Sequence, residues 1–283
     1  MSEFLAVDGG TLAYEVSGEG ALVVLAHGMG DSREAYRFLV PELAAAGHQV
    51  ASVDLRGCGE SSTGWDSYTR TAIAGDLIAL VRHLGGPAVL VGHSIAGGAV
   101  TIAAAQAPEL VTAVVEVAPF TRKQQMRLTD FRHAAYRRGS SALLGTVLLG
   151  SSTQWAKYLD LAYPDVKPAD WTERLERIAA ELARPGRMKV LQKMGTLPPL
   201  DAGRQLPHVT RPVLVVQGSA DPDWVSPRAE GEAILADLPD GLGSLVVIEG
   251  AGHYPHVQHP QQTLAAVLPF LAAHATGRRA ARA

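Results

Sequence analysis

Cysteine is almost absent from the sequence: Cys58 is the single one in 283 residues. One cysteine excludes an intramolecular disulfide and any metal site that needs several thiolates. This usage is compatible with a reducing compartment, and we expect a cytoplasmic protein. The first ten residues contain Glu3 and Asp8 and have no basic region followed by an apolar stretch, so we expect no secretory signal.

Charge is also scarce, and long apolar runs are missing. Charged residues make up 19% of the chain and the net charge is −3, so no nucleic-acid partner is expected. With 47% hydrophobic residues, the chain has the composition of a folded protein. No apolar stretch approaches the roughly 18 residues of a membrane span, so no membrane partner is expected. We expect a small, near-neutral substrate, and nothing in the sequence indicates an oligomeric state.

What the chain does contain is a series of short apolar runs that alternate with helix-like segments. The runs lie at residues 21–26, 50–53, 88–91, 111–117, 212–216 and 244–248. Such runs are typical of parallel strands that crossover helices bury on both faces. Residues 5–7 and 11–16 predict an edge hairpin, and residues 263–273 predict a final helix. The predicted fold class is α/β, with a mostly parallel sheet flanked by helices.

The pattern changes after Pro119. Residues 121–207 lack the buried-strand pattern and contain amphipathic helical stretches instead, for example residues 171–183. We therefore predict a core made of residues 1–120 and 208–283, with an inserted helical cap at 121–207. The cap matches no motif, and we expect it to select the substrate.

A serine lies where one buried strand gives way to a helix of small residues, in the stretch VLVGHSIAGG at positions 89–98. This context predicts a nucleophile elbow, in which a strained turn projects the hydroxyl of Ser94 above the sheet. Ala96 stands where a glycine is usual, and alanine is small enough for that place. The alternative interpretation is an ordinary strand-to-helix turn with a chance serine.

Two backbone groups are candidates for an oxyanion hole. The sequence HGMG at positions 27–30 follows the first buried strand, and we assign one donor to the N–H of Met29. The other is the N–H of Ile95, directly after the serine. We expect His27 to be structural.

A glycine-containing loop at positions 54–61, DLRGCGES, follows the second buried strand. A dinucleotide fingerprint would need a third glycine, which this loop lacks, so no cofactor is expected. Its role is predicted to be architectural, and Cys58 is expected to be a small buried filler.

An acid and a base are expected after the last two buried strands. Asp221 occupies a G-x-x-D-P stretch, and we prefer it as the acid over Asp223, which is the alternative. His253 follows a glycine-rich turn that can bring it over the sheet, and we predict that it is the general base. His253, His256 and His259 are spaced like metal ligands, but prolines interrupt any helix that would align them, so no metal is expected.

In chain order, the motifs H-G, D-x-R-G-x-G-x-S, G-x-S, G-x-x-D and G-x-G-H each follow an apparent strand. The order Ser94, Asp221, His253 distinguishes this arrangement from other serine-triad folds. The chain resembles the α/β-hydrolase superfamily over nearly its whole length. The resemblance implies a serine hydrolase that forms an acyl-enzyme without a cofactor, and an esterase is the simplest expectation.

The same residues are also compatible with other activities. The superfamily also includes enzymes for lactones, amides and ketone-adjacent carbon–carbon bonds, and cofactor-free perhydrolases or haloperoxidases. A receptor or regulatory protein that binds a ligand without turnover is the alternative of another class.

Overall fold

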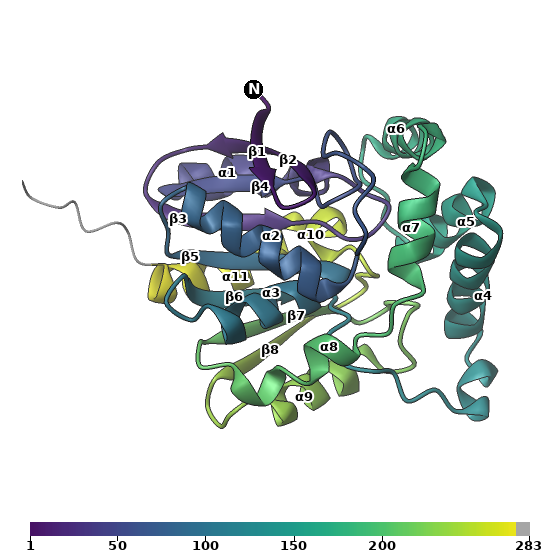
Figure 1. The fold of residues 1–283 in the computed structure, drawn as a ribbon. Coiled ribbons are helices and arrows are strands. Elements are labelled where there is room, and N and C mark those ends of the chain that lie inside the picture. Colours follow the sequence, from purple (N-terminus) through teal and green to yellow (C-terminus); the bar gives the residue numbers. More distant parts are fainter. Residues whose placement is uncertain (276–283) are drawn as a thin grey trace, which may run out of the picture.

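The computed structural model describes residues 1–275, which are built around one eight-stranded sheet. Its strands are β1 (Glu3–Val7), β2 (Gly10–Ser17), β3 (Ala21–Ala26), β4 (His48–Val53), β5 (Ala88–His93), β6 (Val111–Val117), β7 (Val213–Gly218) and β8 (Gly243–Ile248). Across the sheet their order is β1-β2-β4-β3-β5-β6-β7-β8 (Figure 1). The hairpin β1–β2 is antiparallel, as is the pair β2–β4, and every later pair is parallel. The predicted fold class is confirmed.

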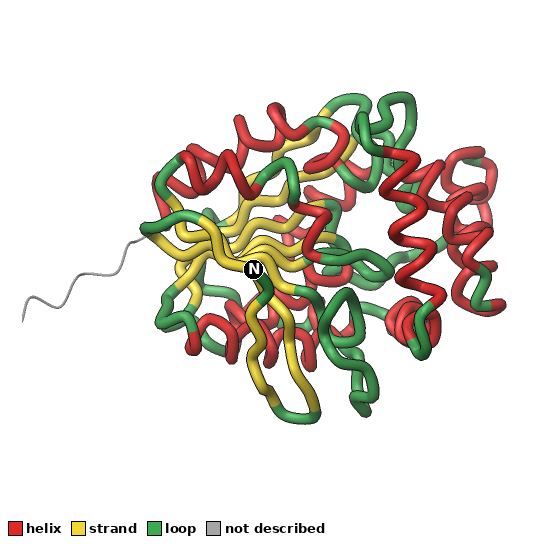
Figure 2. The backbone as a smooth tube through the Cα atoms, turned by 90° about the horizontal axis from the view of Figure 1, so that it is seen from above, coloured by secondary structure: helices red, strands yellow, loops and turns green. Residues whose placement is uncertain are grey.

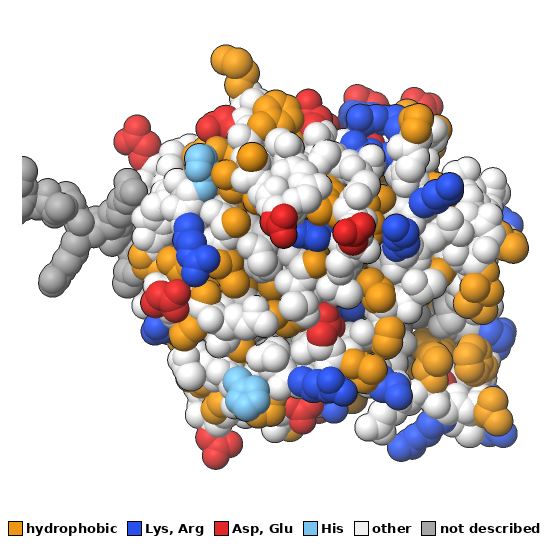
Figure 3. Space-filling model, in the orientation of Figure 1, with side chains coloured by type: hydrophobic (Ala, Val, Ile, Leu, Met, Phe, Trp, Pro, Cys, Tyr) orange, Lys and Arg blue, Asp and Glu red, His pale blue; other side chains and the backbone are white. Residues whose placement is uncertain are grey.

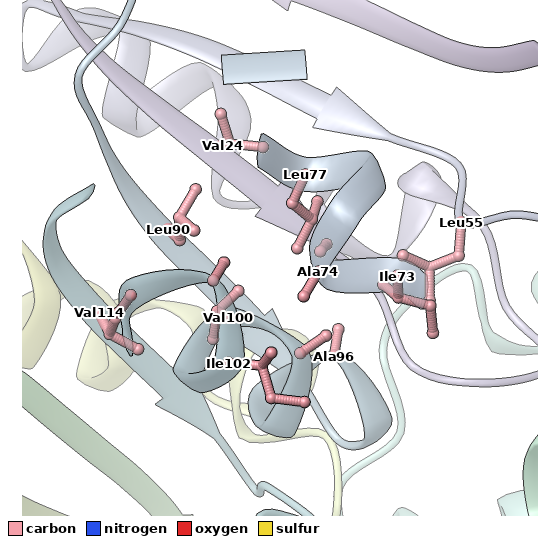
Figure 4. Packing of buried hydrophobic residues seen from close by; sticks show 14 of the residues in the cluster. Val24, Leu55, Ile73, Ala74, Leu77, Leu90, Ala96, Val100, Ile102 and Val114 are labelled. Atoms are coloured by element: carbon pink, nitrogen blue, oxygen red, sulfur yellow. The ribbon is translucent and has the colours of Figure 1, made fainter. Parts of the chain in front are cut away.

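Helices cover both faces of the sheet, as Figure 2 shows. On one face lie α2 (Arg70–His83), α3 (Ile95–Gln106) and α9 (Pro227–Asp237), and on the other lie α1 (Val40–Ala45) and α11 (Pro260–His274). Figure 4 shows how side chains of α2 and α3, such as Leu77 and Val100, pack toward Val24 and Leu90 of the sheet. Burying each such side chain contributes roughly 1.5–3 kcal/mol, which is why the strands are apolar on both faces.

The segment between β6 and β7 is helical. Its elements are η2 (Leu128–Arg132), α4 (Ala134–Leu149), α5 (Ser152–Ala162), α6 (Trp171–Ala183), α7 (Arg187–Gly195), α8 (Leu200–Gly203) and η3 (Leu206–His208). In Figure 1, α4 to α7 stand together beyond one end of the strands, whereas α8 lies against α2 and α3. Trp155, Tyr158 and Leu191 belong to a separate hydrophobic cluster of this segment.

Arginines fasten this helical segment to the core. Arg174 of α6 is buried and pairs with the buried Asp31. Burial alone would raise the pKa of Asp31, but the Arg174 guanidinium lowers it below its usual range. Arg187 of α7 donates to the carbonyl oxygens of Ser61 and Gly59 at 2.9 and 2.8 Å. The ends of the strands are therefore covered by helices that the core holds in place.

The surface in Figure 3 shows positive and negative side chains interspersed, and hydrophobic side chains over the region where α4 lies. Among the exposed hydrophobic residues are Leu144, Leu148 and Leu149 of α4. Within residues 1–275, no helix has both the length and the apolar character needed to span a membrane.

Candidate active site

Ser94 lies in a sharp turn between a strand and a helix. β5 ends at His93 and α3 begins at Ile95, so Ser94 makes the turn with φ 56° and ψ −117°. A positive φ is unfavourable for a residue with a side chain, and such strain is concentrated at functional sites. The Ser94 N–H donates to Val117 O at 3.0 Å, and Ser94 O accepts from Phe120 N at 3.0 Å, so both neighbouring segments hold the turn.

Two glycines make this turn possible. A Cβ atom on Gly92 would lie 2.3 Å from the carbonyl oxygen of Ala96, and one on Gly97 would lie 2.5 Å from Pro119 Cβ. The helix α3 therefore lies too close to β5 for a side chain at Gly92, and too close to the loop after β6 for one at Gly97. Ala96 is fully buried, so the structure accommodates alanine where a glycine is usual.

Asp221 and His253 come together although they follow different strands, β7 and β8. His253 Nδ1 lies 2.8 Å from Asp221 Oδ2, and each residue is only 2% exposed. Because a carboxylate can only accept, Nδ1 carries the proton and Nε2 is left to accept one. The His253 N–H donates to Ala162 O at 2.9 Å, which links this loop to α5.

Ser94 and His253 share their neighbours. The ring of His93, the residue before the serine, lies 4.9 Å from that of His253, and His93 Nε2 donates to the His253 carbonyl oxygen at 2.9 Å. The Phe120 ring lies 5.8 Å from the His253 ring, while the Phe120 N–H binds Ser94. The same two residues thus fix both loops.

A second carboxylate also faces the imidazole. Asp223 Oδ2 lies 3.3 Å from His253 Nδ1, and the hydroxyl of Tyr158, from α5, donates to the same oxygen at 2.6 Å. The Asp223 N–H in turn donates to Asp221 Oδ1 at 2.9 Å. From its sequence context, Asp223 was only the alternative acid. Its spacing from Asp221 was the available signal, whereas no pattern in the sequence indicated that Tyr158 contacts it.

These contacts shift the proton affinities of the site. Burial alone would lower the pKa of His253, but the charges of Asp221 and Asp223 and the hydrogen bond to Asp221 raise it to about 9. Burial raises the pKa of Asp223 to about 6, and the charge of Asp221 contributes to that rise, whereas His253 opposes it. The imidazole is therefore a stronger base than a free histidine.

The two proposed oxyanion donors lie beside Ser94. A Cβ atom on Gly28 would be 3.1 Å from Ser94 Cβ, which shows how closely the loop before Met29 passes the serine. In the described part of the chain the Met29 N–H has no acceptor, and Ile95 is the first residue of its helix, where N–H groups lack an intrahelical acceptor. Ser94, Met29 and Ile95 line one pocket of about 440 Å³.

The other residues singled out in the sequence have structural contacts. His27 Nε2 accepts from Leu55 N at 3.0 Å, while Nδ1 lies 2.6 Å from Gly28 O, so both ring nitrogens are occupied. Asp54 accepts from the backbone of Arg33 and of Glu60. Cys58 is buried, which raises the pKa of its thiol to about 12 and keeps it a neutral filler.

One group of side chains has the spacing of metal ligands. Single ligand atoms of Asp221, Asp223 and His253 lie within 4.8 Å of one another. Asp221 binds His253 and Tyr158 binds Asp223 through hydrogen bonds, so this group is better described as a hydrogen-bonded network than as a metal site. His256 and His259 are not part of this group.

Comparison with known proteins shows to which family the chain belongs. The sequence pattern of the Alpha/beta hydrolase family matches residues 23–267. The 2-(acetamidomethylene)succinate hydrolase of Mesorhizobium japonicum is 30% identical over 269 residues, covering 92% of this chain and 91% of that protein. A pimeloyl-(acyl-carrier protein) methyl ester esterase of Neisseria meningitidis is 30% identical over 258 residues, covering 88% of this chain and 92% of that protein.

A solved structure of an esterase has a similar fold over almost the whole chain. The thermophilic esterase of Thermogutta terrifontis, determined with malate bound, superposes with a TM-score of 0.75 at 26% identity and covers 98% of this chain and 100% of that one. The family match spans most of the chain, and the relatives that match it over nearly their whole length are hydrolases and esterases. The protein is an enzyme that belongs to the alpha/beta hydrolase family.

Proposed function

We propose that the enzyme is a serine hydrolase that cleaves a small carboxylic ester through an acyl-enzyme. Ser94 attacks the carbonyl carbon, and His253 Nε2 takes the hydroxyl proton. Asp221 holds the imidazole in the required tautomer and stabilises its protonated form. The N–H groups of Met29 and Ile95 bind the oxyanion, and each such donor is typically worth about 10²–10³ in turnover.

The observation that carries this proposal is the paired and buried imidazole of His253. Its Nδ1–H is bound by Asp221 at 2.8 Å, which leaves the unprotonated Nε2 of the neutral ring to accept a proton from a hydroxyl. After the alcohol leaves, the same Nε2 activates water, which releases the acid and restores Ser94. These steps require only the residues named and water.

The relatives support an ester as the first substrate class, because an esterase name recurs among the sequence relatives and the solved structures. Amide cleavage is the second candidate. The name of the Mesorhizobium relative gives a substrate with an acetamido group, and the same groups would attack an amide carbonyl.

Residues 121–207 form, in this proposal, a cap that limits access to Ser94. Leu143 and Met194 come from α4 and α7 and line the same pocket as Ser94, which supports a role for these helices in substrate choice. The remaining residues, 1–120 and 208–283, provide the catalytic core. We further propose a small-molecule substrate in the cytoplasm.

Fluorophosphonate labelling and turnover of p-nitrophenyl esters test this proposal. We expect the wild-type protein to be labelled and to hydrolyse short esters, and Ser94→Ala to do neither. His253→Ala should lose several orders of magnitude of turnover while remaining folded, because the triad acts as a unit. Absence of labelling that depends on Ser94 would favour the receptor alternative.

A further inference from the structure

The pocket beside Ser94 has positive charge and no acidic side chain in its lining. Arg70 and Lys123 line it, and its other lining residues are uncharged. Neither cation forms an ion pair with an acidic side chain in the described part of the chain. The overall composition predicted a near-neutral substrate, whereas the positive charge of this pocket favours an anionic one.

Arg70 is held firmly but is not fully satisfied. It is the first residue of α2 and is only 4% exposed. Its Nε donates to Phe120 O at 3.0 Å and its Nη1 to Leu197 O at 2.9 Å. A guanidinium has five N–H donors, and three of those of Arg70 have no acceptor within the described residues. Phe120 and Leu197 themselves line the pocket, so the arginine is anchored to its wall.

Among residues 1–275, no acidic side chain forms an ion pair with Arg70. Burial lowers the pKa of Arg70 to about 10, although Asp201 opposes that effect. The Asp201 carboxylate is occupied by the backbone N–H and the hydroxyl of Thr71 and by the N–H of Ala202. A pKa near 10 leaves Arg70 charged at neutral pH. A buried charge is costly unless it is paired, and a ligand can provide the missing anion.

We propose that the substrate carries a free carboxylate in addition to its ester, and that Arg70 binds this carboxylate while Ser94 attacks the ester. The inference deepens the proposed function and depends on it. Arginine is suited to the task because its planar fork matches the two oxygens of a carboxylate. Lys123, which is exposed, adds positive charge at the same pocket without a fixed partner.

Matched esters that differ by one charge test the inference. Mono-p-nitrophenyl adipate and p-nitrophenyl hexanoate have acyl chains of equal length, and only the first ends in a carboxylate. We expect wild-type kcat/KM to favour the adipate, with background hydrolysis subtracted using Ser94→Ala. In Arg70→Gln the preference should fall about tenfold to hundredfold, mainly through KM, because a charged hydrogen bond is lost.

Two further variants separate binding from folding. Arg70→Lys keeps the charge and should retain part of the preference. Arg211→Gln removes an equal charge that donates to Pro108 O and does not line the pocket, and it should leave the preference unchanged. A purely structural role for Arg70 would lower kcat/KM for both esters equally, and that result would overturn the inference.

A binding measurement keeps the test independent of turnover. Calorimetric titration of Ser94→Ala with methyl hydrogen adipate and with dimethyl adipate should show tighter binding of the acid, and Ser94→Ala/Arg70→Gln should lose the difference. Equal binding of the two by Ser94→Ala would refute the carboxylate site even if fluorophosphonate labels the wild-type enzyme. Failure of labelling alone would instead refute the serine-hydrolase mechanism.

Discussion

At the scale of single residues, the distinctive feature is an imidazole with two carboxylates at one of its nitrogens. Asp221 and Asp223 approach the same nitrogen of His253, at 2.8 and 3.3 Å, but their environments differ. Asp221 makes the shorter contact. Asp223 accepts from Tyr158, so part of its charge is already engaged. Of the two carboxylates, Asp221 can orient the imidazole through its hydrogen bond, while Asp223 adds negative charge that raises the pKa of the ring.

Substituting each carboxylate separately distinguishes these roles. We expect Asp221→Asn to lower kcat by about 10⁴, because an amide at this place no longer enforces the correct tautomer. Asp223→Asn should lower kcat far less, since the hydrogen bond to Asp221 remains. Steady-state kinetics on a p-nitrophenyl ester gives both values. A severe loss in Asp223→Asn beside a mild one in Asp221→Asn would mean that the acid has been misassigned.

The pH profile gives a second prediction for the same residues. A general base must be neutral to accept a proton, and the pKa of His253 is raised to about 9. We therefore expect kcat/KM of the wild-type enzyme to rise with pH until about 9. Asp223→Asn removes a negative charge that favours the imidazolium, so the rise should move to lower pH. The exposed Asp240→Asn variant is the control, and an unchanged profile in Asp223→Asn would contradict the assignment.

At the scale of elements, the turn between β5 and α3 determines whether the serine can be presented. Its geometry depends on the close contact of Gly92 with the first turn of α3, because the carbonyl of Ala96 would lie 2.3 Å from an added Cβ. Because Ser94 joins β5 directly to α3, neither element can move away from the other without displacing Ser94. The turn and Ser94 are therefore one structural unit.

A pair of glycine substitutions tests this dependence. Gly92→Ala should destabilise the protein by about 1–3 kcal/mol through overpacking and lower kcat at least about tenfold by displacing Ser94. Gly75 is an exposed glycine in α2 with nothing near its Cβ position, so Gly75→Ala should stabilise the protein by about 0.5–1 kcal/mol. Chemical denaturation and ester turnover measure both effects. Normal activity in Gly92→Ala would show that the turn tolerates a side chain.

The elements were largely predictable because their signals are local. Buried strands appear as short apolar runs, and the predicted run at residues 111–117 is the strand β6 without change. The same holds for α6 at 171–183. By contrast, Tyr158 is 65 residues from Asp223, and Arg70 carries no motif. Their contacts depend on how the helical segment packs on the core, which no local pattern encodes.

At the scale of the whole molecule, a buried ion pair connects the helical segment to the core. Arg174 is 6% exposed at its side chain and its partner Asp31 is 4% exposed. Arg177, on the same helix, forms its ion pairs where it is 38% exposed. The two arginines thus provide a buried and an exposed connection that can be compared directly.

Removing one partner of the buried pair should be costly. We expect Arg174→Met to lower the free energy of unfolding by about 3–5 kcal/mol, because it leaves Asp31 buried without its counter-ion. Arg177→Met should cost less than about 1 kcal/mol, as is usual for an exposed pair. Guanidinium chloride unfolding measures both. The double variant Asp31→Asn/Arg174→Met should recover part of the loss, and equal effects of the two single variants would argue against a buried connection.

The hydroxyl of Tyr158 has a consequence for chimaeras within this family. A graft that replaces residues 121–207 with the corresponding region of another member also removes the donor that binds Asp223 next to His253, the proposed general base. Such a chimaera should change its optimum pH as well as its substrates, even with every core residue intact. Restoring a tyrosine at that single place in the graft should return the original optimum without returning the original substrate range.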